Sequence, residues 1–309
     1  LVGSEMCIRD RYLSFRCGMQ EIFTYPWMEE SYVNAVLLST EGILSLSTPP
    51  SPAERFVRSS LLPNLCKAVV KNERYFDEFS IFETAQVFRD ENYTAPYDER
   101  EKLPSQRKNV AGAFVTTDKD ITALFRKAKG VVEMMARYVH METLTFRQTE
   151  KPVWADNVVW LNIYRGDEKV GDLALLAKKV SMACGIKNMN VMLFQLDQDS
   201  LVPLKSRTNT FTHLAEYPMT DYDISLLVDG SVQWKDVAQT VRGIKSELLH
   251  GAAFVDEYRG KQVPAGKKSL TLRLAIGSKD KTLTSAEIEE VASSVLNKIA
   301  KRFGAELRR

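Results

Sequence analysis

The stretch TLTSAEIEEVASSVLNKIAKRFGAELR, from Thr282 to Arg308, contains the clearest secondary-structure pattern in this chain. Thr284 and Glu287 have the spacing of a capping box, in which each side chain bonds a free backbone N–H at a helix start. Apolar residues then recur every three or four positions, and Gly304 can take the positive φ that ends a helix. The stretch therefore predicts one helix followed by a short strand at Ala305–Arg308.

The residues before this stretch extend the pattern to βαββαβ. A second apolar stripe at helical spacing consists of Val237, Val241, Ile244 and Leu248. The segments that predict strands are Asp223–Val228, Ala252–Tyr258 and Lys268–Ile276. This order of elements is ferredoxin-like, a small sheet with both helices on one face. The fold alone indicates no function.

Length and composition describe an ordinary globular protein. The 309 residues favour two domains, and 44% hydrophobic residues are sufficient for real cores. A net charge of +2 gives no reason to invoke nucleic acid, and no apolar run approaches the roughly 20 residues of a membrane span. The four cysteines and three histidines lack the spacing of a metal site or a disulfide framework. They fit a protein of the reducing cytoplasm that holds no metal.

Local charge is more informative than the total. The segment from Arg259 to Arg273 contains no acid, and the cations between its ends are Lys261, Lys267 and Lys268. A run of this kind is either a solvated loop or a contact with phosphate groups. The charge pattern alone leaves both interpretations open.

The first two thirds of the chain alternate helices with strands. The segments whose apolar spacing predicts helices are Ser60–Asn72, Ile121–Val139 and Ala177–Gly185. The predicted strands lie in Gln20–Met28, in two pieces across Glu78–Glu91, in a hairpin of Val158–Tyr164 with Val170–Leu176, and at Asn190–Leu196. Residues 92–108 are polar and contain Pro96 and Pro104, so we expect a loop there.

Several short motifs in this sequence are known together in one protein family. In the last third they are YP before DIS, FVDEYRG at Phe254–Gly260, PAGKKSL at Pro264–Leu270, TLT, and GAELR at Gly304–Arg308. Their order resembles the C-terminal anticodon-binding domain of bacterial phenylalanyl-tRNA synthetase β subunits. GMQEIFTY, RSSLLPNL at Arg58–Leu65, and IFE before VF resemble the catalytic-like domain of the same subunit.

The resemblance covers residues 13–309 and implies an α+β protein. Residues 13–200 are similar to the class II synthetase fold, a largely antiparallel sheet with helices, and form a pseudo-catalytic domain. Residues 201–212 are expected to be a linker, and residues 213–309 a ferredoxin-fold anticodon-binding domain. Residues 1–12 resemble neither a signal peptide nor a helix of that domain, so we expect a non-native leader there. The resemblance is weakest around residues 155–190, where the family's His-Pro pairs are absent.

One segment of the first domain has the form of a catalytic motif. Phe88-Arg89-Asp90-Glu91 matches the F-R-x-E strand in which class II synthetases bind the α-phosphate of ATP through arginine. An active site also needs a Gly-rich third motif with an arginine, and Ala183–Phe194 has one glycine and no arginine. We therefore expect no catalytic residue in this chain, with Arg89 in a structural or interface role. The resemblance likewise implies that ATP and magnesium serve the assembled enzyme, with no site for either here.

The resemblance implies that the C-terminal domain reads the anticodon of tRNA-Phe. By motif, Tyr258 stacks on the first anticodon base, and Ser225, Asp256 and Ser269 contact its edge. The candidates for contact with the RNA backbone are Lys261, Lys267 and Lys268. From the sequence pattern alone, Tyr258 would be interpreted as an aromatic residue packed in the core of the sheet, and Asp256 as an acidic residue of a turn. Where the family usually has Arg-Asp, this chain has Tyr222-Asp223, so a phosphate contact is lost or aromatic surface replaces it.

The implied partners are an α subunit, in an (αβ)₂ heterotetramer, and tRNA-Phe, with no membrane. The implied activity of that complex is the ATP-dependent attachment of phenylalanine to tRNA-Phe. Two alternatives stay open. One is a single-chain, organelle-type phenylalanyl-tRNA synthetase, against which the absent third motif argues. The other is a non-catalytic RNA-binding or scaffold paralogue, which only the finding of an α-subunit partner excludes.

Overall fold

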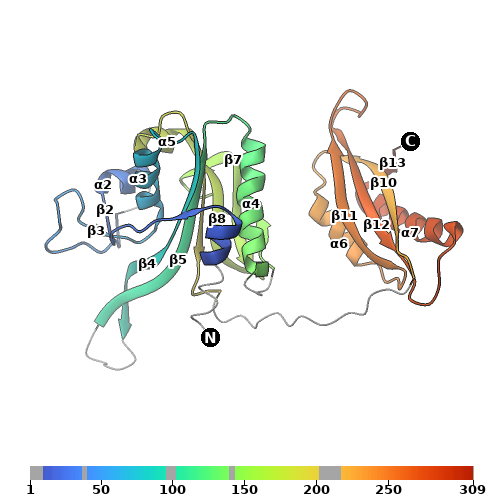
Figure 1. The fold of residues 1–309 in the computed structure, drawn as a ribbon, viewed down its shortest axis with the longest axis horizontal. Coiled ribbons are helices and arrows are strands. Elements are labelled where there is room, and N and C mark those ends of the chain that lie inside the picture. The colour runs from blue at the N-terminus through green and yellow to red at the C-terminus, as the bar shows by residue number, and fades with distance from the viewer. Residues whose placement is uncertain (1–9, 37–39, 95–101, 139–142, 202–216, 309) are drawn as a thin grey trace. The chain divides into compact units, whose positions relative to one another are not determined.

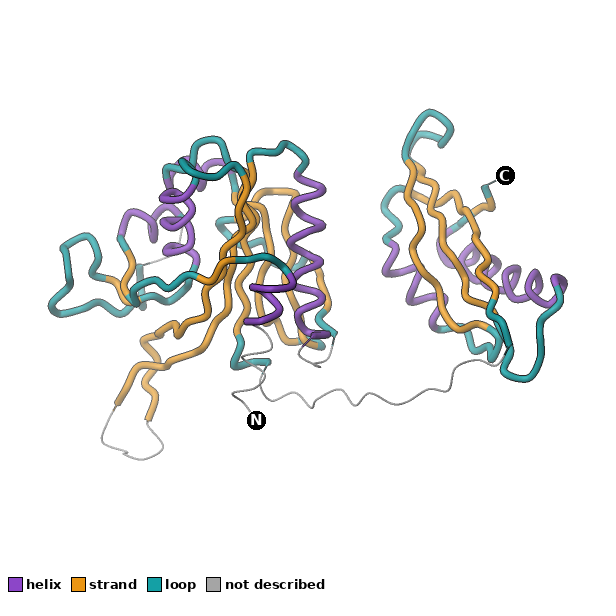
Figure 2. Tube along the Cα trace, in the orientation of Figure 1, coloured by secondary structure: helices purple, strands orange, loops and turns teal. Residues whose placement is uncertain are grey.

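The computed structural model describes residues 10–36, 40–94, 102–138, 143–201 and 217–308. The chain divides into two compact units, Leu1–Asn209 and Thr210–Arg309. Figures 1 and 2 draw both units from the same side. Leu201, the first residue of the predicted linker, is buried in the core of the first unit. The rest of that linker lies outside the described residues.

Within the described residues, a seven-stranded sheet forms the middle of the first unit. Its order is β1 (Gln20–Glu21), β4 (Glu78–Thr94), β5 (Lys102–Thr116), β9 (Asn190–Asp197), β8 (Glu168–Leu176), β7 (Ala155–Arg165) and β6 (Thr145–Arg147). Among these strands β1 and β4 are parallel, and every other neighbouring pair is antiparallel. Two short strands, β2 (Trp27–Met28) and β3 (Phe56–Val57), form a separate ladder. The mainly antiparallel sheet flanked by helices confirms the predicted α+β class.

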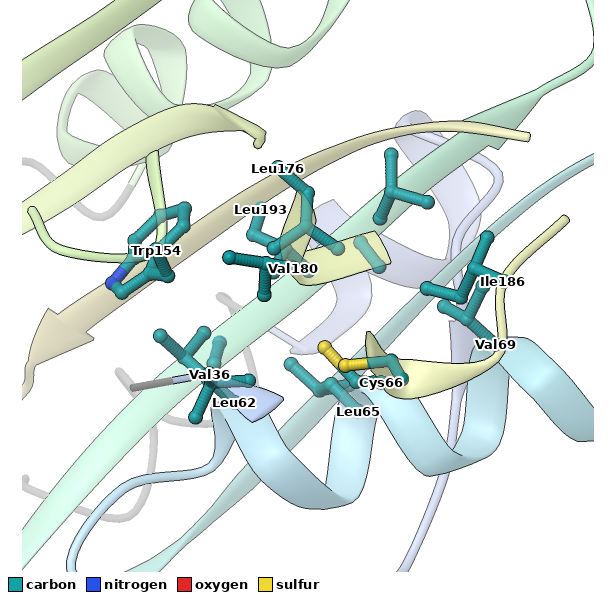
Figure 3. Packing of buried hydrophobic residues seen from close by; sticks show 14 of the residues in the cluster. Val36, Leu62, Leu65, Cys66, Val69, Trp154, Leu176, Val180, Ile186 and Leu193 are labelled. Carbon is teal, nitrogen blue, oxygen red and sulfur yellow. The ribbon is translucent and has the colours of Figure 1, made fainter. Parts of the chain in front are cut away.

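Helices cover both faces of this sheet because side chains alternate between the faces along each strand. Ile81 and its neighbour Phe82 on β4 belong to two different cores. The Ile81 core contains α2 (Glu30–Ala35), α3 (Leu62–Asn72) and α5 (Lys178–Cys184). Figure 3 shows this packing, with Leu65 and Cys66 of α3 near Val180 of α5.

The Phe82 core lies under the long helix α4 (Ile121–Tyr138) and a short π-helical turn, η1 (Tyr12–Arg16). Gly112 of β5 belongs to this side, where a Cβ would lie 2.6 Å from the Phe194 ring. A larger residue there forces the aromatic layer to move. Helix α4 thus packs on the sheet as its predicted apolar stripe requires.

Only the last three residues of the predicted leader, residues 10–12, are described in the structure. Residues 1–9 lie outside the described part of the structure. Tyr12, the last residue of the predicted leader, is 5% exposed, and its hydroxyl donates to the Val131 carbonyl oxygen at 2.9 Å. Its ring lies 4.6 Å from that of Tyr138. Tyr12 therefore belongs to the core of the first unit.

The loop predicted over residues 92–108 is wrong at both ends, and residues 95–101 between them lie outside the described residues. The structure continues β4 to Thr94 and begins β5 at Lys102, and these two residues pair. Pro104 is tolerated because β9 borders β5 only from Asn109 onward, which leaves this part of β5 on the sheet edge. The hydrogen bonds of the ladder hold the two strands together, and polar composition does not reveal such a ladder.

The two strand pieces predicted across Glu78–Glu91 are one strand. β4 runs without a break and has a bulge between Arg89 and Asn92. The sequence pattern also misses the apolar end of β5, which pairs with β4 on one side and β9 on the other. A central strand buried on both sides lacks the alternation by which a half-buried strand is recognised.

The second unit has the predicted βαββαβ order. Its elements are β10 (Thr220–Asp229), α6 (Trp234–Arg242), β11 (Leu249–Tyr258), β12 (Lys267–Ile276), α7 (Ser285–Phe303) and β13 (Glu306–Leu307). The strand order in the sheet is β11-β12-β10-β13. Thr284 and Glu287 form the predicted capping box, and Gly304 ends α7 with φ of 62°. Both helices contribute to one core with the sheet, which confirms the ferredoxin-like fold.

The first helix of this unit is shorter than its apolar stripe predicts. Ile244 and Leu248 belong to the predicted stripe, yet α6 ends at Arg242 with Gly243 as its C-cap. Both residues still pack against the core from the segment that follows. The stripe therefore identifies core residues correctly and misplaces the helix end, because glycine stops the helix first. No helix in the described part of the chain is long and apolar enough to cross a membrane.

Candidate nucleic-acid interface

The sheet of the second unit has two different faces. On β10, Ile224, Leu226 and Val228 are buried against α6 and α7, and the residues between them point to the other side. We call that other side the open face. The register places on it Asp223 and Ser225 of β10, Asp256 and Tyr258 of β11, Lys267, Ser269, Thr271 and Arg273 of β12, and Glu306 and Arg308 at β13.

The four residues predicted to contact a base lie together on the open face. Tyr258 is opposite Ser269, and Asp256 is opposite Thr271. Thr271 is opposite Ser225 on its other side, and their hydroxyl oxygens are 2.9 Å apart. Tyr258 and Asp256 are both exposed, Tyr258 by 39%. The structure thus brings an aromatic ring, a carboxylate and hydroxyl groups into two adjacent rows across the sheet.

Ser269 is the unusual member of this group. It is only 2% exposed although it points to the open face, and its hydroxyl has no hydrogen-bond partner among the described residues. A buried hydroxyl without a partner costs about 1–3 kcal/mol. Such a group can regain that free energy by bonding to a ligand.

The three predicted lysines do not act together. Lys268 is 4% exposed and lies on the helix side of β12, with its Nζ 2.8 Å from Glu257 Oε2. Lys267 lies on the open face, with its Nζ 3.4 Å from Glu306 Oε1. Lys261 is exposed in the loop between β11 and β12. Of these three lysines, Lys267 is therefore the one that the register places on the open face.

The pKa of Glu257 reflects its bond to Lys268. Burial opposes ionisation of this carboxyl, but bonds from Lys268 and Arg259 outweigh burial and lower its pKa. Glu257 is therefore ionised at neutral pH and holds both cations. Lys268 consequently stabilises the end of the β11–β12 hairpin.

The end of the open face near the start of β10 is closed by an ion pair. The guanidinium of Arg273 makes two bonds to the Asp223 carboxylate, at 2.7 and 2.8 Å. These bonds lower the pKa of Asp223. Tyr222 is partly buried and packs against the core on the helix side, so it adds no aromatic surface to the open face.

Sequence reasoning missed Arg308. The guanidinium carbon of this residue lies 5.4 Å from the centroid of the Tyr258 ring. Its backbone N–H donates to the Ser225 carbonyl oxygen at 2.8 Å, and its Nη2 donates to Gln262 Oε1 at 3.1 Å. The signal in the sequence was its place at the end of the last strand, where alternation puts it on the same face as Ser225.

In the first unit, the arginine of the catalytic-like motif is exposed. Arg89 lies on β4 opposite Ser105 and faces solvent, and the side chains of Asp90 and Glu91 are outside the described set. Within the described residues, no group of three or more His, Cys, Asp or Glu side chains is arranged to hold a metal ion.

A buried polar cluster lies close to this motif. Glu83 is 1% exposed and accepts bonds from the Thr24 backbone N–H at 2.9 Å and from Arg58 at 3.1 Å. The Nε of Arg58 donates to the Gln86 carbonyl oxygen at 2.6 Å. Burial lowers the pKa of Arg58, although Glu83 works against that shift. The cluster ties the segment after β1 to β4.

Next to the cluster, several aromatic side chains are exposed. Phe23 is 83% exposed and Tyr25 is 70% exposed. The Tyr25 ring stacks on that of Trp27 at 4.5 Å between centroids. These side chains border a hollow of about 280 Å³ whose other wall is α3, with Lys67 and Lys71. Large aromatics exposed together are typical of a protein-binding surface.

Both units of the chain match known protein domains. Residues 215–308 match the ferredoxin-fold anticodon binding domain, and residues 9–198 match the phenylalanyl tRNA synthetase beta chain CLM domain. A solved pyrrolysyl tRNA synthetase from Desulfitobacterium hafniense superposes with a TM-score of 0.52 at 13% identity, covering 65% of this chain and 68% of that chain. That similarity shows a shared fold alone.

Several curated relatives share one name. The phenylalanine–tRNA ligase beta subunit of Carboxydothermus hydrogenoformans is 26% identical over 94% of this chain, which corresponds to 37% of the relative. The Bacillus licheniformis protein of that name is 28% identical over 94% of this chain and 36% of its own length. The chain thus spans little more than a third of the length of these relatives. Because the CLM-domain match alone covers more than half of the chain, this protein belongs to the phenylalanyl-tRNA synthetase beta chain family.

Proposed function

We propose that this chain acts in a phenylalanine–tRNA ligase, where its second unit reads the anticodon of tRNA-Phe. The single observation that carries the proposal is the position of Ser225, Asp256, Tyr258 and Ser269 on one open face of an anticodon-binding fold. The names of the curated relatives support the choice of amino acid and of tRNA.

Each open-face group has a distinct task in this proposal. The Tyr258 ring stacks on an unpaired base, and such contacts contribute about 1–3 kcal/mol per base. The Asp256 carboxylate accepts from the N1–H and N2–H₂ groups of guanine, and the Ser225 and Ser269 hydroxyls bond other polar atoms of its edge. Lys261 and Lys267 neutralise phosphates. Lys268 has a structural task, because Glu257 already holds its ammonium group.

The first unit contributes contacts with a catalytic α subunit. The relatives are called beta subunits, which implies an alpha subunit, and Phe23 and Tyr25 expose the aromatic surface that such a partner covers. In this proposal ATP and magnesium bind in the partner, and the assembly is an (αβ)₂ heterotetramer.

Replacement of Tyr258 by alanine tests the anticodon assignment. In the enzyme assembled with its α subunit, Tyr258→Ala is expected to weaken tRNA-Phe charging and to leave phenylalanyl-adenylate formation intact. Tyr217→Ala is the matched control, because Tyr217 is 36% exposed and Tyr258 39%. Equal loss of both activities in Tyr258→Ala would contradict the assignment of Tyr258 to anticodon binding.

Two experiments separate the alternatives. The chain alone is expected to show no ATP–pyrophosphate exchange, and measurable exchange would favour a single-chain synthetase. Co-purification with an α subunit is expected as well. Recovery of the chain with RNA and without an α subunit would favour a non-catalytic RNA-binding paralogue.

A further inference from the structure

Arg308 is an open-face residue to which the proposed function gives no task. Its backbone N–H is held by the Ser225 carbonyl oxygen at 2.8 Å, so it lies beside β10 just after β13. Tyr258 lies on β11, at the opposite edge of the sheet. The Arg308 guanidinium carbon is nevertheless 5.4 Å from the Tyr258 ring centroid. The two side chains therefore reach toward each other over the central strands β12 and β10.

The loop between β11 and β12 supports both side chains. The Arg308 Nη2 donates to Gln262 Oε1 at 3.1 Å. A Cβ on Gly260 would lie 2.3 Å from the Tyr258 hydroxyl oxygen, so the end of the ring rests against the backbone of Gly260. Aromatic rings and guanidinium planes are the two kinds of side-chain surface on which proteins stack unpaired bases. Here one of each lies opposite the other.

We propose that Tyr258 and Arg308 form the two sides of a clamp that stacks one unpaired base between the ring and the guanidinium. This clamp rests on the proposed RNA-binding function and adds a second stacking residue to it. Stacked bases lie about 3.4 Å apart. A base therefore fits once the guanidinium moves from 5.4 Å to about 7 Å from the ring centroid. The bond to Gln262 gives way in this movement, and the bond to Ser225 stays.

The clamp also gives a reason for the unpartnered hydroxyl of Ser269. Ser269 is the residue of the central strand β12 that pairs with Tyr258 in the ladder, and it is 2% exposed. In the same row of the ladder, Ser269 lies between Tyr258 of β11 and Leu227 of β10. A base held in the clamp brings polar edge atoms within reach of the hydroxyl.

Arg308→Lys separates a clamp from a simple phosphate contact, since lysine keeps the charge and loses the planar guanidinium. In the assembled enzyme, Arg308→Lys and Arg308→Gln are both expected to weaken binding of a tRNA-Phe transcript about fivefold or more. With a transcript that lacks the first anticodon base, neither substitution is expected to weaken binding further. The loss of affinity caused by the Arg308 substitution and the loss caused by removal of the base are then not additive, because both changes remove the same stacking interaction.

Arg302→Lys is the matched control. The Arg302 guanidinium carbon also lies over an aromatic ring, that of Phe303 at 5.3 Å, but on helix α7. This variant is expected to bind both transcripts as the unsubstituted enzyme does.

Two results overturn the clamp and leave the proposed function standing. One is wild-type affinity in Arg308→Lys combined with a loss in Arg308→Gln, which indicates a phosphate contact. The other is equal weakening by Arg308→Lys on the intact and the abasic transcript. If neither Tyr258→Ala nor removal of the base changes affinity, the proposed function fails and the clamp fails with it.

Discussion

The Arg58–Glu83 cluster of the first unit and the open face of the second unit both combine arginine, carboxylate and hydroxyl groups, but only the first is complete by itself. Glu83 receives bonds from Thr24 and Arg58, and the Ser60 hydroxyl nearby donates to Gln195 Oε1 at 2.9 Å. On the open face, Ser269 has no partner within the described residues, and Asp256 is exposed. Polar groups that bond each other stabilise a fold, whereas polar groups left without partners are available to a ligand.

The largest expected effect is on the stability of the first unit. Glu83→Gln leaves Arg58 buried without a counter-charge, and loss of one partner of a buried pair costs about 3–5 kcal/mol. We expect the urea unfolding transition of this unit to shift by that free energy. The control is Glu78→Gln on the same strand, since the Glu78–Lys127 pair is exposed and contributes about 0–1 kcal/mol. Similar shifts in both variants would contradict the structural role of the cluster.

Two buried serines provide a more direct comparison. Ser60→Ala removes a satisfied hydroxyl and leaves Gln195 with one donor fewer, so we expect a loss of about 1–3 kcal/mol in the free energy of unfolding. Ser269→Ala removes an unsatisfied hydroxyl and is expected to leave that free energy unchanged or to raise it. The same Ser269 variant is expected to bind tRNA-Phe more weakly. Destabilisation by Ser269→Ala, measured by chemical denaturation, would show that the hydroxyl has a partner after all.

Neighbouring lysines extend the comparison within the second unit. Lys267→Gln is expected to reduce the slope of log binding constant against log salt concentration by about one, with no change in stability. Lys268→Gln removes the partner of Glu257, so it is expected to lower the thermal stability of this unit and to leave the salt slope unchanged. Filter-binding titrations at several salt concentrations measure both slopes. A reduced salt slope in Lys268→Gln together with an unchanged slope in Lys267→Gln would show that Lys268, and not Lys267, contacts the RNA.

The smallest effect concerns the capping box of α7. Bonds from Lys281 and from the Thr284 backbone N–H lower the pKa of Glu287 to about 2. Because the folded pKa lies below the usual value of about 4.3, the stabilisation is present above that pH and is lost as the pH falls toward 2. Glu287→Gln is expected to flatten the dependence of stability on pH in this window. If the pH dependence of unfolding were the same in Glu287→Gln, ionised Glu287 would not stabilise the fold through the capping box.

The second unit could be predicted from its sequence more completely than the first. Local signals such as the capping box, Gly304 and two apolar stripes determine the order of its elements, and alternation places Ser225, Asp256, Tyr258 and Ser269 on one face. The same signals misplace the end of α6 because they do not weigh Gly243 against the stripe. In the first unit, β5 and the long β4 depend on pairing between distant residues, which no local pattern reveals.

The site was predicted in part. The four residues proposed to contact a base follow from the resemblance to a family, but the burial of Lys268 and the contact between Arg308 and Tyr258 do not. Lys268 pairs with Glu257 across two strands, and Arg308 reaches Tyr258 from the opposite edge of the sheet. Both facts depend on the order of strands in the sheet, which the sequence presents only as a linear list of elements.

Discrimination between two tRNAs shows whether Tyr258 takes part in reading the first anticodon base. The measurement compares kcat/KM for tRNA-Phe with kcat/KM for the same tRNA carrying a different first anticodon base, in the assembled enzyme and in its Tyr258→Ala variant. We expect a clear preference for tRNA-Phe in the unsubstituted enzyme and a ratio close to one in the variant. An unchanged ratio in Tyr258→Ala would contradict the proposal that the open face reads the base.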